Sequence, residues 1–403
     1  MMHRSFLSIL LCFFLIDTLA QSLAVTNVNV IDVQTMRVLP SQTVLIKDGH
    51  ILSVGNRRRQ LIVPKDYTVV DGKDKFMIPG LWDMNVHLSY YGEEALSMLV
   101  ANGVTSVRDM GGDLKQIDGW RNDIKEGRRV GPMIYRAGPF VDGPKKMDSQ
   151  RGSFTKVVKN EKQGRLAVDE LKKMGVDFIN IDSHVPKSAF SAIVAKAKSQ
   201  RLPLAVHAPV DVPLADVARA GVRSIEHAES LLGGAIYEKD SVKRNQLTDE
   251  AFKRLETDSI FAIIRKNGNY YDPTVSSLYL LKGSSYEKRL GPRLLPLVKR
   301  LQRAGVPLLT GTDFASKSAG IVPGKDLHRE LELFVEAGMT PGQALRCATV
   351  NAAKCMHDER RLGVIVPGKI ANLVLLDSNP LNDISNTRKI YKVIVNGKLL
   401  ENQ

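Results

Sequence analysis

The fold is decided by three successive pieces of sequence: GVDFINI (residues 175–181), AFSAIVAKAKSQRL (189–202) and PLAVHAP (203–209). The first and third are short apolar runs typical of buried strands. The middle piece repeats its apolar residues at the spacing of one helical face, from Phe190 to Ala197. A strand, a helix and a second strand in this order predict two parallel strands in one sheet.

The same rhythm recurs along the chain. ADVARAG (215–221) precedes RSIEH (223–227), and LVKRLQRAG (297–305) precedes VPLLTGTD (306–313). Repeated units of this kind over about 290 residues suit a closed (β/α)₈ barrel. The fold class is therefore α/β, and we place the barrel at residues 76–365, beginning with the apolar run at Phe76.

The two ends of the chain have a different texture, with short alternating or apolar stretches separated by Asp, Asn and Gly. These stretches are LAVTNVNVIDV (23–33), TVLIKDGHILSVG (43–55), ANLVLLDSNPL (371–381) and KIYKVIVNGKLL (389–400). They predict one small β-sandwich domain built from residues 21–75 and 366–403.

Residues 1–20 form a separate unit. Arg4 supplies a positive charge, Phe6 to Ile16 an apolar core and Thr18-Leu19-Ala20 a cleavage site. This pattern is typical of a secretory signal peptide, and the run is shorter than the roughly 20 apolar residues of a spanning helix. Cys12 lies inside the run, so no lipid anchor is expected. We expect a secreted or periplasmic protein cleaved near Ala20.

The composition is that of an ordinary globular protein, with 43% hydrophobic and 25% charged residues among 403. The net charge of +14 is scattered rather than gathered into a run, which argues against a nucleic-acid partner. A basic surface favours anionic ligands at most weakly, since such charge usually serves as a solvated exterior. Cys347 and Cys355 lie too far apart along a helix to form a disulfide.

Polar residues stand where several of the expected barrel strands end, the place at which barrels carry their active sites. They are Asn85, His87, Asn180, His207, His227 and Asp313. A lone histidine at a strand end is more often structural than a ligand, but several in the same relative position favour a metal site. Imidazoles on neighbouring strands could share a divalent ion such as zinc. Asp313 could bind that ion or accept a proton from water.

The chain resembles the amidohydrolase superfamily, in particular its imidazolonepropionase-like and prolidase-like metal-dependent dipeptidases. The resemblance spans nearly the whole chain after the signal. The motifs that carry it are PGLWDMNVHL (79–88), NGVTSVRDMGG (102–112), GVDFINI, LAVHAP, SIEHAE (224–229), LLTGTD (308–313), LHRELELFVEAGMTP (327–341) and LGVIVPGKIANLVLLDSNPL (362–381). It implies the composite barrel-plus-sandwich fold, hydrolysis of C–N bonds and a centre of one or two metals.

The resemblance also implies ligands, position by position. His207, His227 and Asp313 match the ligands that end the fifth, sixth and eighth barrel strands, and the aspartate is the family's proton shuttle. The family closes its first strand with a His-x-His pair, where this chain has Asn85 and His87. The family's fourth strand commonly ends in a carboxylated lysine that bridges two metals, where this chain has Asn180.

The two asparagines predict a smaller metal centre than the family's. An amide cannot form the bridging carbamate, and it is a poor ligand for zinc. We expect one ion, zinc by preference, held by His207 and His227 with a water and Asp313, and with His87 as a further candidate ligand. Recruitment of Asp182 or His184, or of an external carboxylate, is the alternative.

Three functions compete. The first is a metal-dependent hydrolase of small amide substrates, such as dipeptides or N-acyl amino acids, with Asp313 as the proton acceptor. The second is a catalytically impaired relative that binds a ligand or partner in the barrel pocket. The third is a protein without activity or ligand, in which the histidines contribute only to packing. The expected partner is a small molecule, a homo-oligomer remains open, and no serine or cysteine is placed for covalent catalysis.

Other residues have simpler explanations. Tyr271 and His328 lie in segments that resemble substrate-facing segments of the family, although aromatic packing and a surface histidine explain them equally well. Thr340, Pro341 and Gln343 form the start of a helix with a capping box, so they need no catalytic role.

Overall fold

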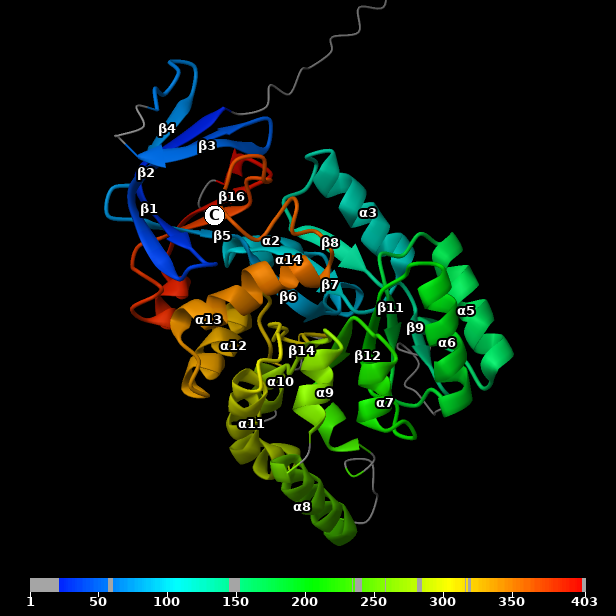
Figure 1. The fold of residues 1–403 in the computed structure, drawn as a ribbon. Coiled ribbons are helices and arrows are strands. Elements are labelled where there is room, and N and C mark those ends of the chain that lie inside the picture. Colours follow the sequence, from blue (N-terminus) through cyan, green and yellow to red (C-terminus); the bar gives the residue numbers. More distant parts are fainter. Residues whose placement is uncertain are drawn as a thin grey trace, which may run out of the picture.

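The computed structural model describes residues 22–56, 61–144, 153–233, 235, 241–257, 259–280, 285–315, 317 and 320–400. The expected signal peptide lies outside these residues. Figure 1 shows a small β-sheet layer, blue and red, beside a larger body of strands and helices. None of the helices in the described ranges is both long and apolar enough to span a membrane.

The small layer is a sheet built from both ends of the chain, as the sequence predicts. Its strands follow the order β17-β16-β15-β5-β1-β2-β3, and β4 also pairs with β1. The bounds are β1 (Leu23–Asp32), β2 (Arg37–Lys47), β3 (His50–Asn56), β4 (Thr68–Asp71), β5 (Phe76–Pro79), β15 (Leu373–Leu376), β16 (Ile390–Val395) and β17 (Lys398–Leu399). Its buried face includes Val25, Val44 and Leu373.

The strand that begins at Phe76 belongs to this sheet, whereas we expected it to open the barrel. β5 pairs in parallel with β1 through Asn29 and Phe76, and antiparallel with β15 through Pro79 and Leu373. A four-residue apolar run suits either environment, so its neighbours decide where it lies. The barrel therefore starts one strand later, at Leu81.

The barrel strands form two sheets, β6-β7-β8 and β10-β9-β11-β12-β13-β14. Their bounds are β6 (Leu81–Val86), β7 (Val104–Asp109), β8 (Met133–Arg136), β9 (Phe140–Asp142), β10 (Thr155–Val157), β11 (Ile179–Ile181), β12 (Leu204–His207), β13 (Ser224–Glu226) and β14 (Tyr270–Asp272). Within each of these sheets the barrel strands pair in parallel.

Residues 307–314 close the ring between the last and first of these strands. Leu308 bridges to Tyr271 of β14, and Phe314 bridges to Val86 of β6, both in parallel. The amide of Asp177, just before β11, donates to Arg136 O at the end of β8 and joins the two sheets. The expected (β/α)₈ barrel is thus confirmed.

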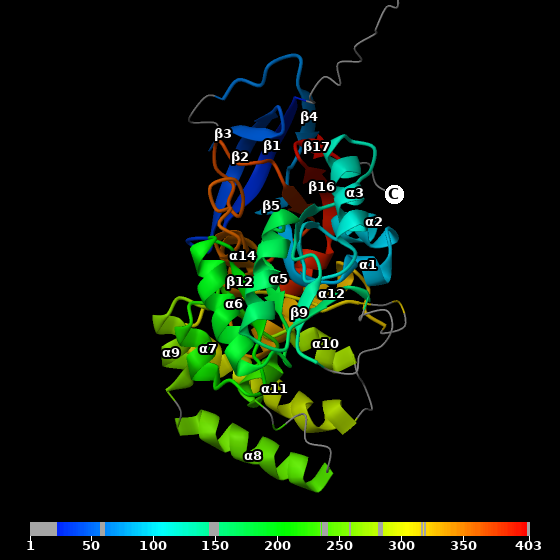
Figure 2. The same ribbon diagram turned by 90° about the vertical axis from the view of Figure 1, so that its right-hand side faces the viewer.

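Helices surround the strands (Figures 1 and 2). They are α1 (Leu88–Tyr91), α2 (Glu94–Ala101), α3 (Leu114–Lys125), α5 (Glu161–Lys173), α6 (Lys187–Ser199), α7 (Leu214–Arg219), α8 (Ser241–Thr257), α9 (Ile260–Lys266), α10 (Val275–Leu280), α11 (Ser285–Arg303), α12 (Lys325–Glu336), α13 (Pro341–Arg346) and α14 (Ala352–Cys355). Shorter helical turns are η2 (Ala228–Leu231), η5 (Cys347–Asn351) and η6 (Ile384–Arg388).

Two local predictions are confirmed in this part of the chain. The capping box of α13 is present, with the Thr340 side chain accepting from Gln343 N and the Gln343 side chain accepting from Thr340 N. Cys347 and Cys355 are both buried and free. Burial raises the pKa of the Cys347 thiol to about 12 and that of Cys355 to about 11, so both are inert neutral thiols.

Candidate active site

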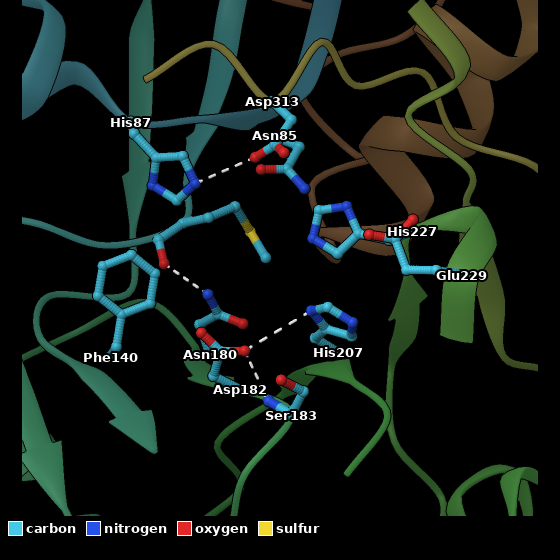
Figure 3. Close-up of a pocket in the computed structure, with 11 residues that line it drawn as sticks. Asn85, His87, Phe140, Asn180, Asp182, Ser183, His207, His227, Glu229 and Asp313 are labelled. Carbon is cyan, nitrogen blue, oxygen red and sulfur yellow. Dashed lines mark hydrogen bonds and ion pairs between the residues drawn. The ribbon is translucent and has the colours of Figure 1, made fainter. Parts of the chain in front are cut away.

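A cavity of about 220 Å³ opens at the carboxyl ends of the barrel strands (Figure 3). All six strand-end residues singled out from the sequence line this cavity: Asn85, His87, Asn180, His207, His227 and Asp313. The structure adds Met110, Phe140, Asp182, Ser183 and Glu229 to the lining. Strand ends far apart in the sequence thus contribute to one pocket.

Two of the histidines stand next to each other. His207 ends β12 and His227 follows β13, and their ring centroids are 4.7 Å apart. His227 has a positive φ of 64°, and its Nδ1 lies 3.0 Å from Thr274 Oγ1. The Tyr271 hydroxyl donates to the His227 carbonyl at 2.8 Å. These contacts hold His227 in a backbone conformation that non-glycine residues seldom adopt.

His87 and Asp313 form a second pair. The His87 Nε2 atom lies 3.2 Å from Asp313 Oδ1, while its Nδ1 atom lies 3.3 Å from Gly111 O. The backbone of Asp313 is fixed by its amide, which donates to Asn85 O at 2.8 Å. Burial raises the pKa of Asp313, but His227 and His87 outweigh burial, so the pKa lies below its usual value. The Asp313 carboxyl group is therefore ionised at neutral pH.

The two asparagines occupy different situations. Asn180 donates its Nδ2 hydrogen to Met110 O at 2.6 Å, and Figure 3 shows its amide oxygen on the cavity side. Asn85 is fully buried, and neither its Oδ1 nor its Nδ2 atom has a hydrogen-bond partner in the described part of the protein. A buried amide without partners is costly, so Asn85 is suited to a ligand group in the cavity.

Of the two alternative ligands, Asp182 lines the cavity and His184 does not. Asp182 Oδ1 lies 3.6 Å from His207 Nδ1 and accepts a hydrogen bond from Ser183 N at 2.6 Å. The Nδ1 atom of His184 lies 2.9 Å from Ser183 Oγ. Asp182 thus faces His207 in the cavity, whereas the His184 ring contacts the adjacent Ser183.

A buried ionic layer lies beneath the cavity. Arg108 donates to Glu226 Oε2 and Ser224 Oγ, both at 2.7 Å, and to Met84 O at 2.6 Å. Its guanidinium is also 3.7 Å from Asp272, whose pKa burial raises well above the usual value. These residues lie on β6, β7, β13 and β14, so the layer ties together the strands that carry the site.

The cavity lining includes side chains of the kinds that hold a metal ion. Among the described residues, no three His, Cys, Asp or Glu side chains are already grouped as a metal site. His207 and His227 present neighbouring imidazoles, and the Asp313 carboxylate lines the same cavity. A bridged pair of ions does not fit, because Asn180 has no amine to carboxylate and Asn85 offers only an amide.

Tyr271 and His328 do not line the cavity. Tyr271 is fully buried and supports His227 from behind, as described above. His328 lies in α12, where Nδ1 contacts Thr387 Oγ1 at 2.9 Å and Nε2 contacts Asn102 O at 3.1 Å. It is buried between the barrel and the C-terminal segment rather than on the surface.

The sequence analysis missed Glu229, Ser183, Met110 and Phe140 as lining residues. Glu229 and Ser183 follow strand ends by a few residues, which is a usable signal. Phe140 does not follow an apolar run that stands out in the sequence, so no signal pointed to it. Met110 lines the cavity because the chain turns at Gly111, whose φ is 146°.

Comparisons with known proteins show the family to which the chain belongs. A profile of the amidohydrolase family matches residues 76–400, and the chain belongs to that family. The adenine deaminase of Clostridium perfringens is 24% identical over 370 residues, which cover 89% of this chain but 55% of the deaminase. The chain thus spans about half the length of that relative.

Two further proteins match over most of their length. The imidazolonepropionase of Symbiobacterium thermophilum is 24% identical, with 85% of each chain covered. The crystal structure of a putative prolidase from Bifidobacterium longum superimposes with a TM-score of 0.77, at 23% identity and with 94% of both chains covered. The expected resemblance to the imidazolonepropionase-like and prolidase-like group is confirmed, and the family is generally metal-dependent.

Proposed function

We propose that this protein hydrolyses C–N bonds in small amide or peptide-like substrates, such as dipeptides or N-acyl amino acids, with one divalent ion, zinc by preference. The observation that carries the proposal is the convergence of His87, His207, His227 and Asp313 on one cavity at the barrel mouth. Family membership supports hydrolysis, and the prolidase-like and imidazolonepropionase-like matches support a small C–N substrate.

His207 and His227 would hold the ion, and a water and the Asp313 carboxylate would complete the set. When bound, such an ion lowers the pKa of water and polarises the substrate carbonyl. The chain's own residues do the rest. Asp313 takes the proton of the attacking water and passes it to the leaving nitrogen, and His87 holds the carboxylate beside the reacting atoms.

The side-chain amide of Asn85, at the end of the first barrel strand, would bind the substrate. Its unpartnered Nδ2 group can donate to a substrate carbonyl oxygen, and its Oδ1 atom can accept from a substrate N–H. An amide bond in the substrate offers both of these groups. This fits a substrate of the proposed class without a second ion.

Hydrolysis by the purified chain tests the proposal, with ninhydrin detection of amino acids released from a dipeptide and N-acyl amino acid panel. We expect Asp313→Asn to lower kcat by about 10²- to 10⁴-fold, because it removes the proton acceptor. Asp211→Asn removes an exposed carboxylate after β12 and should leave kcat unchanged. Full retention of turnover in Asp313→Asn contradicts the mechanism.

The second candidate is a binding protein that holds a ligand in this cavity without turning it over. Asn85 and Asn180 favour it, since they replace two metal ligands of the family. A chain that binds small amides but hydrolyses none of the panel, with or without added zinc, supports this alternative.

We also propose that residues 1–20 direct export and are removed near Ala20. The positive residue, apolar core and small-residue site described for the sequence support it.

A further inference from the structure

Glu229 occupies an unusual position in the cavity wall. It lies in η2, two residues after His227, and lines the cavity beside that histidine (Figure 3). Its Oε2 atom is buried and has no hydrogen-bond partner within the described residues. A buried carboxylate oxygen is stable only when something pairs with it.

The other two carboxylates of the cavity have protein partners. Asp313 contacts His87 at 3.2 Å, and Asp182 accepts from Ser183 N and faces His207 at 3.6 Å. The nearby Tyr271 hydroxyl is not available to Glu229, because it donates to His227 O. Glu229 is thus the carboxylate that the protein leaves for a ligand.

Among the described residues, the cavity lining includes three histidines but no Lys or Arg, although the whole sequence has 57 Lys and Arg residues. The basic exterior suggests anionic ligands, but the cavity wall at Glu229 carries a carboxylate. Local charge at the contact decides which group is bound, because exposed charges beyond about 10 Å are screened by salt.

We propose that Glu229 binds a positively charged nitrogen group of the substrate. This deepens the proposed function and rests on it: the substrate would be a small amide that carries an α-ammonium, alkylammonium or guanidinium group. Glu229 supplies a charge-assisted hydrogen bond at one wall. Met110 and Phe140 supply apolar surface to the same cavity.

The test measures binding rather than turnover, so that it does not depend on hydrolysis. Ligand-observed NMR on the purified full chain gives dissociation constants for probes that have no hydrolysable bond. Alaninol represents an α-ammonium group, and n-butylammonium and n-butylguanidinium represent basic side chains. Butanol is the neutral counterpart.

We expect at least one cationic probe to bind the wild-type protein about 10- to 100-fold more tightly than butanol. Glu229→Gln keeps the shape of the side chain but removes its charge, and should reduce the cation's affinity to that of butanol. Asp211→Asn removes an exposed carboxylate after β12 that does not line the cavity, and should change nothing. The cation that binds most tightly identifies the substrate group.

Equal cation affinity in Glu229→Gln, or cationic probes that bind the wild-type protein no better than butanol, overturns the proposal. Loss of zinc from Glu229→Gln, measured as metal per chain, also overturns it, since Glu229 would then be a metal ligand. Failure of the proposed function looks different: the chain would bind the cationic probes through Glu229 and yet hydrolyse nothing. Conversely, the chain could hydrolyse neutral amides equally well in the wild type and in Glu229→Gln. That result would support the proposed function and contradict the binding of a cationic group by Glu229.

Discussion

His87 and Asp313 come from the first and last strands of the barrel and meet across its seam, with Nε2 and Oδ1 3.2 Å apart. The segment that ends in Asp313 is bonded to β6 through Asn85 O, so the two side chains are fixed relative to each other. Closure of the barrel therefore assembles the proposed proton acceptor and its histidine partner at once.

The number of zinc ions per chain should depend on Asn85 and Asn180. We expect one zinc per chain in the wild-type protein, measured by plasma mass spectrometry after dialysis, because His207 and His227 form one pair of imidazoles. Asn85→His combined with Asn180→Lys restores the family's ligands and should raise the content to two. The control Asn267→His adds an exposed histidine and should not raise it. Wild-type protein that holds no zinc contradicts the one-ion prediction and favours the binding protein.

Arg108 should be essential for stability. Arg108→Met leaves the Glu226 carboxylate buried without the cation that it pairs with, so we expect the free energy of unfolding to fall by about 3–5 kcal/mol. Urea denaturation followed by circular dichroism measures it. The control Arg121→Met breaks a half-exposed ion pair with Asp177 and should cost about 1 kcal/mol or less. Similar losses in the two variants would show that the buried layer has no special role.

His328 should make the fold sensitive to acid. Burial lowers its pKa to about 4 from an ordinary value of 6.5, so the folded protein resists protonation that the unfolded chain accepts. Its contribution to stability is complete above pH 6.5 and is lost progressively as the pH falls toward 4. His328→Gln should flatten the pH dependence of the unfolding free energy between these values. His50→Gln, at an exposed position, provides the control, and an unchanged slope in His328→Gln would refute the assignment.

Processing at the N-terminus is open to direct measurement. Expression of the full chain in a secreting host should yield protein in the exported fraction whose first residue lies near Gln21, as read by Edman sequencing. Replacement of Leu10 and Leu11 by Asp interrupts the apolar core and should retain the chain in the cell. Exported protein that still begins with Met1 argues against cleavage.

Most of the fold could be predicted because its signals are local. Alternating apolar runs and helical faces occur within single segments such as residues 175–209, and the strand-end position of His207 and His227 follows from them. Phe76 was misplaced because a short apolar run does not specify its neighbours. The β-sheet pairing partners of β5, at Asn29 and Leu373, lie far away in the sequence.

The composition of the site was predictable and its pairing was not. Strand ends indicated which residues converge, but the 3.2 Å contact of His87 with Asp313 depends on barrel closure. The orientation of Asn85 depends on its neighbours in three dimensions in the same way. Glu229 follows His227 by two residues in a turn, and only the folded chain shows that its carboxylate is left without a partner.

The position of β5 makes completion of the small sheet a long-range event. β5 is flanked by β1, which lies close to it in the sequence, and by β15, which lies on the far side of the whole barrel segment. Until β15 pairs with it, β5 has an unpaired edge, the kind of surface through which partly folded chains aggregate. Protection of that edge therefore requires the barrel segment to bring β15 back to β5.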